Sequence, residues 1–184
     1  MPPQDILESI VNTFKEFDLQ VTTPKSTQEL PYNAALVDFG TDEENRSVVL
    51  QVLHYSHDIL SSIEELSVVK SNVPISILSF LMTVPVNIPE NTSNEVLRLI
   101  SLANKAIPIG AFNYSAAEKG VYYSYNIPIH NEPPAEIILA TILHTSLFVK
   151  DTFFMSVDLI AQGKETVESL MQEEQQTVNP SSLR

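Results

Sequence analysis

Apolar residues recur at two different spacings along the chain, and the changes between them predict where helices and strands lie. Apolar positions three and four residues apart, from Ile6 to Phe17, predict a first helix over about residues 5–18. From residue 33 onward, β-branched and alternating apolar residues favour strands instead. The predicted strands are Asn33 to Phe39, Ser47 to Tyr55, Ile75 to Val86, Ala111 to Tyr114 and Val121 to Ile127. The weakly patterned segment between His57 and Asn72 could form a short helix over residues 58–66.

Two later segments are predicted to be helices. Thr92 and Glu95 have the spacing of a capping box, in which the hydroxyl and the carboxylate each satisfy a free backbone N–H at a helix start. The helix that follows, which ends at Pro108, is apolar around most of its circumference, so we expect it to be covered on two sides. The last helix is predicted from Ala135 to about Gln162.

These elements follow one another in the order α-β-β-β-α-β-β-α. Because strands and helices do not alternate strictly, the order predicts an α+β fold, with a mainly antiparallel sheet of about five strands and helices packed on it. We expect a single domain over residues 1–163. The Glu- and Gln-rich segment 164–184 is predicted to be a polar C-terminal extension, partly disordered, in which a frayed helix is followed by disorder.

Charge and composition narrow the class of protein. The chain has 184 residues, no cysteine and a net charge of −13, which excludes disulfides and cysteine-based metal sites and argues against nucleic acid as a partner. Residues 1–66 hold twelve acidic and three basic side chains, so they carry −9 of that charge. Such a segment is either a solvated surface or an acidic face that attracts basic partners.

The location is predicted from the absence of a targeting pattern. The N-terminus becomes amphipathic at once, without a basic start and an apolar core, so we expect a cytoplasmic protein. The longest apolar run, residues 137–149, falls short of the ~20 residues that a membrane span needs, so no membrane partner is expected.

Few residues could carry chemistry. His54 and His57, with Asp58 next to them, could form a metal or catalytic cluster. On a strand, however, this spacing puts the two imidazoles on opposite faces. His144 is expected to be a partly exposed histidine on the last helix. We therefore predict no catalytic, cofactor-binding or metal-binding residues, and no cofactor.

Two further clusters have structural explanations. Asp42, Glu43 and Glu44 lack the ligand spacing and the glycine of a calcium loop, so they are expected at a solvated hairpin tip. The tyrosines could stack nucleic-acid bases, but the basic groove that should accompany them is missing, so core or interface packing is the better explanation. They are Tyr114, Tyr122, Tyr123 and Tyr125.

Two segments resemble a known family. The run 104–112, with Asn104, Gly110 and Phe112, and the aromatic run 119–128 resemble the YbjN family, which shares the fold of type III secretion chaperones. The resemblance covers about Thr92 to Gly163 and otherwise lies in the order of elements. It implies a homodimer formed through the middle helix and neighbouring strands, without nucleotide or cofactor, that holds an extended segment of a client protein. It supplies no active-site residue.

The function expected from the sequence is that of a non-enzymatic, chaperone-like or regulatory protein-binding module, acting as a homodimer. Its partner would dock in apolar grooves and along exposed strand edges. The alternative is a regulatory protein that binds a small ligand between the sheet and the last helix, in a pocket lined by the tyrosines. A third hypothesis is an enzyme that uses His54, His57 and Asp58.

Overall fold

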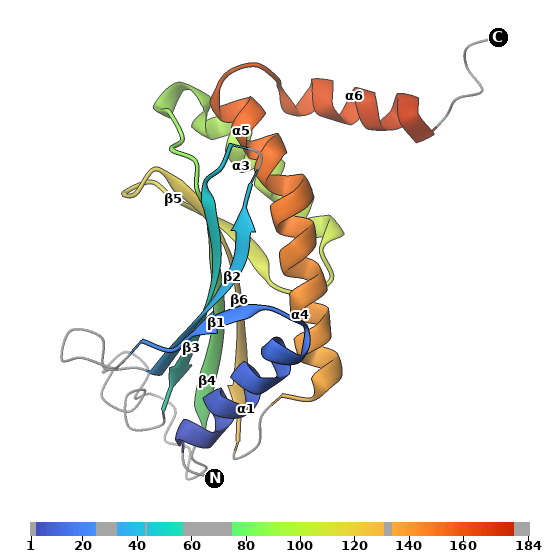
Figure 1. Ribbon diagram of the computed structural model, residues 1–184. Helices are drawn as coiled ribbons and strands as arrows, with labels where there is room; N and C mark the ends of the chain where they lie inside the picture. Colours follow the sequence, from blue (N-terminus) through green and yellow to red (C-terminus); the bar gives the residue numbers. More distant parts are fainter. Residues whose placement is uncertain (1–2, 25–32, 43, 57–74, 131–133, 179–184) are drawn as a thin grey trace.

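Six strands form one antiparallel sheet in the computed structural model, which describes residues 3–24, 33–42, 44–56, 75–130 and 134–178 (Figure 1). The strands are β1 (Gln20–Thr22), β2 (Asn33–Thr41), β3 (Ser47–Tyr55), β4 (Ser76–Val84), β5 (Ala111–Ser115) and β6 (Gly120–Ile129). They lie in the order β1-β2-β3-β4-β6-β5, so that β1 and β5 are the two edges.

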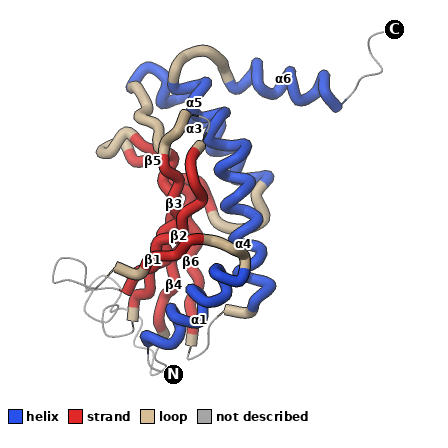
Figure 2. Tube along the Cα trace, in the orientation of Figure 1, coloured by secondary structure: helices blue, strands red, loops and turns tan. Residues whose placement is uncertain are grey.

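The helices lie on one face of this sheet (Figure 2). They are α1 (Pro3–Glu16), α3 (Ser93–Ala106) after the 3-10 turn η2 (Glu90–Thr92), α4 (Glu136–Phe148), the π-helical segment η3 (Val149–Phe153), α5 (Phe154–Ala161) and α6 (Val167–Val178). The continuous helix α4–η3–α5 runs along the sheet, with α1 near one end and α3 near the other (Figure 1). α6 projects away from the body.

The hydrophobic core forms where alternate strand residues meet the helices. Val52, Phe80 and Tyr125 lie side by side on neighbouring strands, and Val52 and Phe80 are completely buried. The opposite face carries a mixed row, in which Gln51, Leu81 and Ser124 are neighbours and only half-buried. Among the described residues, no helix covers that second face (Figure 2).

The predicted α+β fold with a mainly antiparallel sheet is confirmed. The sheet has one strand more than expected, because Gln20–Thr22 pairs with β2 as a three-residue edge strand. The last helix spans the predicted residues, with a π-helical segment in its middle. The short helix considered over residues 58–66 lies outside the described residues.

The predicted capping box at Thr92 is wrong. Thr92 belongs to the 3-10 turn and already has helical dihedral angles (φ −108°, ψ −5°), so its hydroxyl donates to the carbonyl of Pro89 at 3.1 Å. The Glu95 carboxylate binds Arg98 and the backbone N–H of Val167 instead.

α3 is covered on two sides, as its apolar circumference predicts, but incompletely. It contacts β5 on one side and α5 and α6 on another. Val96 and Ile100 are buried, whereas Leu97 remains 44% exposed.

Candidate functional site

An apolar groove lies between three helices at the end of the sheet where α3 packs. α3 contributes residues at helical spacing, and the groove has a volume of about 200 Å³. Its lining is Leu99, Leu102, Ala103, Ala106, Phe148, Thr152, Phe153, Ser156, Val167, Leu170 and Met171. Most of these side chains are apolar, so the groove favours an apolar guest over a charged one.

Large apolar side chains at this groove remain in contact with water. Phe148 is 49% exposed and Met171 is 45% exposed, although both line the groove. On the same long helix, Leu147 and Met155 are also exposed. Contiguous exposed apolar surface on a folded protein commonly marks a binding site. This groove is therefore the candidate site for a macromolecular partner.

One wall of the groove is α6, which polar contacts attach to α3. The Glu95 carboxylate accepts a hydrogen bond from the backbone N–H of Val167 at 3.2 Å, and so satisfies a free donor at the start of α6. Arg98 forms ion pairs with Glu95 and with Glu168. Val167 is buried beneath these contacts, so the first turn of α6 belongs to the body of the domain.

The start of α6 is also encoded locally. Thr166 and Ser169 form a reciprocal capping pair, in which each backbone N–H is bound by the other residue's hydroxyl, at 2.8 and 3.2 Å. A helix was expected in the extension 164–184, as a frayed one, but without this capping signal. The spacing of Thr166 and Ser169 could have revealed the helix start.

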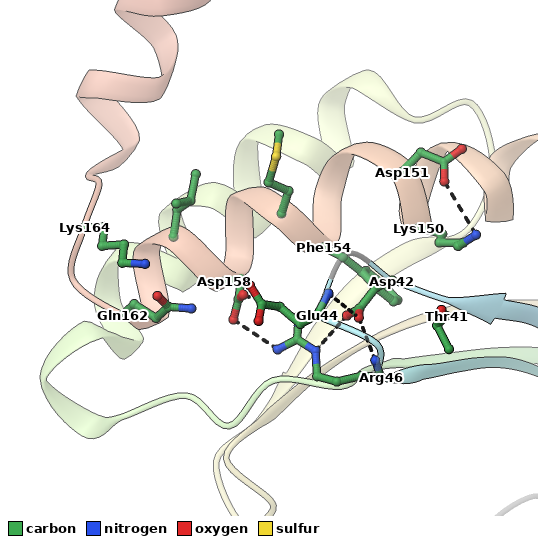
Figure 3. Close-up of a pocket in the computed structure, with 12 residues that line it drawn as sticks. Thr41, Asp42, Glu44, Arg46, Lys150, Asp151, Phe154, Asp158, Gln162 and Lys164 are labelled. Atoms are coloured by element: carbon green, nitrogen blue, oxygen red, sulfur yellow. Dashed lines mark hydrogen bonds and ion pairs between the residues drawn. The ribbon is translucent and has the colours of Figure 1, made fainter.

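A second, polar cavity of about 570 Å³ lies between the tip of the β2–β3 hairpin and α5 (Figure 3). Asp42 accepts hydrogen bonds from the backbone N–H groups of Glu44 and Arg46 and from the Arg46 side chain. Arg46 in turn donates to both carboxylate oxygens of Asp158 on α5, at 3.2 and 3.4 Å. The predicted hairpin tip is therefore bound to the last helix; Glu43 lies outside the described residues.

The charges of Asp42, Arg46 and Asp158 at this cavity are mutually satisfied. Burial acts to raise the pKa of Asp42, but the hydrogen bonds from Arg46 and Glu44 outweigh it, so the pKa lies below its ordinary value. Lys150 and Lys164 also line the cavity, at opposite ends in Figure 3. Because these cations do not converge and Arg46 is engaged by carboxylates, the arrangement anchors the hairpin. It does not form an anion-binding site.

The histidine candidates are not brought together as a site. His54 lies on the helix-covered face of β3 and is 2% exposed, and neither ring nitrogen has a partner among the described residues. Burial lowers its pKa. His57 and Asp58 lie outside the described residues, and His144 is on an exposed side of α4. In the described ranges no three His, Asp or Glu side chains group as metal ligands.

The residues on which the resemblance to the YbjN family was based make contacts that stabilise the fold. The Asn104 side chain binds both backbone groups of Phe112, and the Tyr123 hydroxyl donates to the carbonyl of Ile109. Gly110 has a positive φ of 73°, and an added Cβ there would meet the Tyr123 ring. Tyr123 is therefore core, as predicted, and it cannot line the ligand pocket that the alternative hypothesis required.

The sheet edges offer little room for a further strand. β1 is three residues long. On β5, the amide of Asn104 already occupies the N–H and C=O of Phe112. An incoming strand would have to displace that side chain, so the groove is the better docking site than the edges.

The acidic residues that the structure describes in the N-terminal segment do not form a single face. Glu8 and Glu16 are exposed on α1, whereas Asp42 and Glu44 lie at the hairpin tip next to α5. These two places are at opposite ends of the sheet (Figure 1). The even spread favours the interpretation as a solvated surface.

The long helix Glu136–Ala161 is, in the part of the chain that the structure describes, the one helix long and apolar enough to cross a membrane. The core helices of soluble proteins also meet this criterion. Here Leu139, Ile142 and Val157 pack into the core. The sequence analysis had considered only residues 137–149 of this helix.

Comparisons with protein-family models, with curated proteins and with solved structures give no match to this chain. The argument about function therefore rests on the site itself.

Proposed function

We propose that this chain is a non-enzymatic protein-binding module that acts as a homodimer and holds a segment of a partner protein in the groove between α3, the long helix and α6. The observation that carries the proposal is the exposure of Phe148 and Met171 at an apolar groove. Burying each side chain under a partner would contribute roughly 1 kcal/mol or more, since about half of each surface leaves water.

The groove suits a partner's side chains better than a small polar ligand. Its lining offers few hydrogen-bond donors or acceptors, chiefly the hydroxyls of Thr152 and Ser156. Small-molecule sites combine an apolar lining with several convergent polar groups, whereas helix-in-groove recognition needs mainly apolar pockets. The resemblance to the YbjN family, with its chaperone-like fold, agrees with this choice.

The proposed dimer uses the outer side of α3, where Leu97 is exposed. Leu97→Asp should give a folded monomer, because the side chain is not part of the core. Light scattering coupled to size-exclusion chromatography measures the mass. Ile100→Asp would be a poor probe, because Ile100 is buried and its change would unfold the domain. A monomeric wild-type chain would remove the dimer from the proposal.

Site-specific photo-crosslinking tests the groove. The full chain, expressed in its own cells with a benzoyl-phenylalanine at position 148, should crosslink to a defined peptide that mass spectrometry can sequence. The matched control carries the same group at Ile137, which is 73% exposed on the same long helix but outside the groove. Equal crosslinking from both positions, or none from position 148, would overturn the proposal.

The polar cavity at the hairpin tip supports a second candidate function, the binding of a small ligand. Its volume of about 570 Å³ falls within the usual range for such sites. Retention of a small molecule by the purified chain, lost in Met155→Trp, would favour this function. Native mass spectrometry of the two proteins makes the comparison.

A further inference from the structure

Two cations of α3 lie close to the apolar groove, and one of them, Arg98, is already paired with Glu95 and Glu168. Arg98 and Lys105 are both exposed and lie seven residues apart on α3, on either side of Leu102, which lines the groove. The chain has no acidic residue between Glu95 and Glu118, although its net charge is −13. An apolar groove with the unpaired cation Lys105 at its border favours a partner that places a carboxylate there.

The α6 helix of the same chain already packs against this side of the groove. Val167 and Leu170, three residues apart, face the groove, and Glu168 between them pairs with Arg98. The α6 segment contains three glutamates and no lysine or arginine. Its first turn thus places two apolar side chains along the groove and one carboxylate on Arg98.

The other end of the groove, toward Lys105, also combines apolar side chains with a nearby cation, but α6 does not cover it. Lys105 forms no ion pair with any residue that the structure describes; its neighbour Ala106 lines the groove, as does Phe148 on the long helix. The volume of about 200 Å³ can admit a side chain the size of an aromatic ring, since engineered cavities of about 150 Å³ bind benzene.

We propose that the part of the groove that α6 leaves open binds an acidic amphipathic helix of a partner protein. The apolar side chains of that helix would lie next to Phe148, and its carboxylates would lie against Lys105. This inference rests on the proposed protein-binding function and adds the chemistry of the partner. Apolar residues spaced i, i+3, i+4 and i+7 would face the groove, as in other helix-in-groove complexes.

Two synthetic peptides provide the test. Both have leucines at i, i+3, i+4 and i+7 over about 18 residues, long enough to form helix in water. In one, the flanking positions are glutamate, and in the other they are lysine. Fluorescence anisotropy measures the binding of each labelled peptide to the full chain at low and at high salt.

The glutamate peptide should bind about threefold tighter than the lysine peptide at low salt, because the exposed Lys105 attracts a carboxylate and repels an ammonium group. Lys105→Glu should abolish this preference. Lys119→Glu, which changes the net charge equally at the exposed β5–β6 turn, should preserve it. Equal binding of both peptides, no binding of either, or equal effects of the two variants would overturn the inference.

Failure of this inference differs from failure of the proposed function. If position 148 crosslinks to a partner segment that is not acidic, the function stands and the partner chemistry is wrong. If it crosslinks to a second copy of the chain, the groove is a self-association site, and the inference of a separate partner is overturned.

Discussion

The side-chain amide of Asn104 in α3 binds both backbone groups of Phe112 in β5. Its oxygen accepts the Phe112 N–H at 2.7 Å, and its nitrogen donates to the Phe112 carbonyl at 3.1 Å. These are the contacts that a neighbouring strand would make, so one side chain closes this point of the sheet edge and fixes α3 against it. The position of α3 in turn sets one wall of the groove.

Asn104→Ala is expected to destabilise the domain by about 1–2 kcal/mol, because it leaves two backbone groups without their partner. Urea unfolding followed by circular dichroism measures the change. Asn94→Ala, also in α3 and exposed, controls for the higher helix propensity of alanine and should be nearly neutral. Asn104→Asp retains the acceptor for the Phe112 N–H, so it should recover part of the loss. Equal stability of the two alanine variants would contradict the assignment.

Gly110→Ala should cost more stability than Gly163→Ala. Both glycines have positive φ angles, 73° and 66°, so each alanine carries the same backbone strain of about 1 kcal/mol. At Gly110 the new methyl group would also meet the buried Tyr123 ring, whereas nothing lies within 4 Å of the Cβ position at Gly163. We expect the Gly110 variant to lose about 2 kcal/mol more, as other overpacked cores do. Parallel thermal unfolding of the two variants gives the difference.

Most of the fold could be predicted because its signals are local. The β2–β3 and β5–β6 hairpins follow from alternation and turn residues, and the long helix follows from its apolar residues and Gly163. β1 was missed because a three-residue edge strand has no period of its own and forms only by pairing with β2. The capping-box error at Thr92 arose because Thr92 is the last residue of a 3-10 turn, so its hydroxyl binds the Pro89 carbonyl although α3 begins directly after it.

The candidate site was predictable only in part. The excess of apolar residues on α3 indicated a second contact surface, and Leu99, Leu102 and Ala106 do line the groove. Its other wall comes from Phe148 and Met171, which lie more than forty residues away, so no local pattern links them. The contact between Glu95 and Val167 is equally remote, because it spans 72 positions. Such contacts depend on how the helices pack, which the sequence pattern does not specify.

The buried His54 should make stability depend on pH. Burial lowers the pKa of its imidazole in the folded state, while in the unfolded chain it titrates near 6.5. The contribution of the neutral ring is therefore complete above pH 6.5. It is lost as pH falls below that value, by up to about 1.4 kcal/mol per pH unit, until the lowered pKa is reached.

His54→Phe removes the titrating imidazole and keeps an aromatic ring in the core. The loss of unfolding free energy between pH 7.5 and pH 5 should accordingly be smaller in the variant than in the wild-type chain. Urea titrations at several pH values measure both slopes. Identical slopes would show that His54 does not titrate differently in the two states.

Arg98 is expected to control how firmly α6 stays on the body of the domain. The guanidinium joins Glu95 on α3 to Glu168 on α6, and these hydrogen bonds raise its pKa above the ordinary value. Arg98→Met removes both ion pairs and leaves Glu95 and Glu168 to repel each other. The start of α6 should then open more often, and trypsin should cut after Lys164 several times faster than in the wild-type chain.

Lys105→Met is the matched control for this experiment. It removes one exposed cation from the same helix without touching α6, so cleavage after Lys164 should stay at the wild-type rate. Raising the salt concentration should speed cleavage of the wild-type chain toward that of Arg98→Met, because the ion pairs are exposed and screened. It should slow cleavage of Arg98→Met slightly, because it screens the repulsion between Glu95 and Glu168. If both variants are cut at the wild-type rate, the ion pairs of Arg98 do not hold α6 in place, and the apolar contacts of Val167 and Leu170 do so together with the hydrogen bond from Val167 to Glu95.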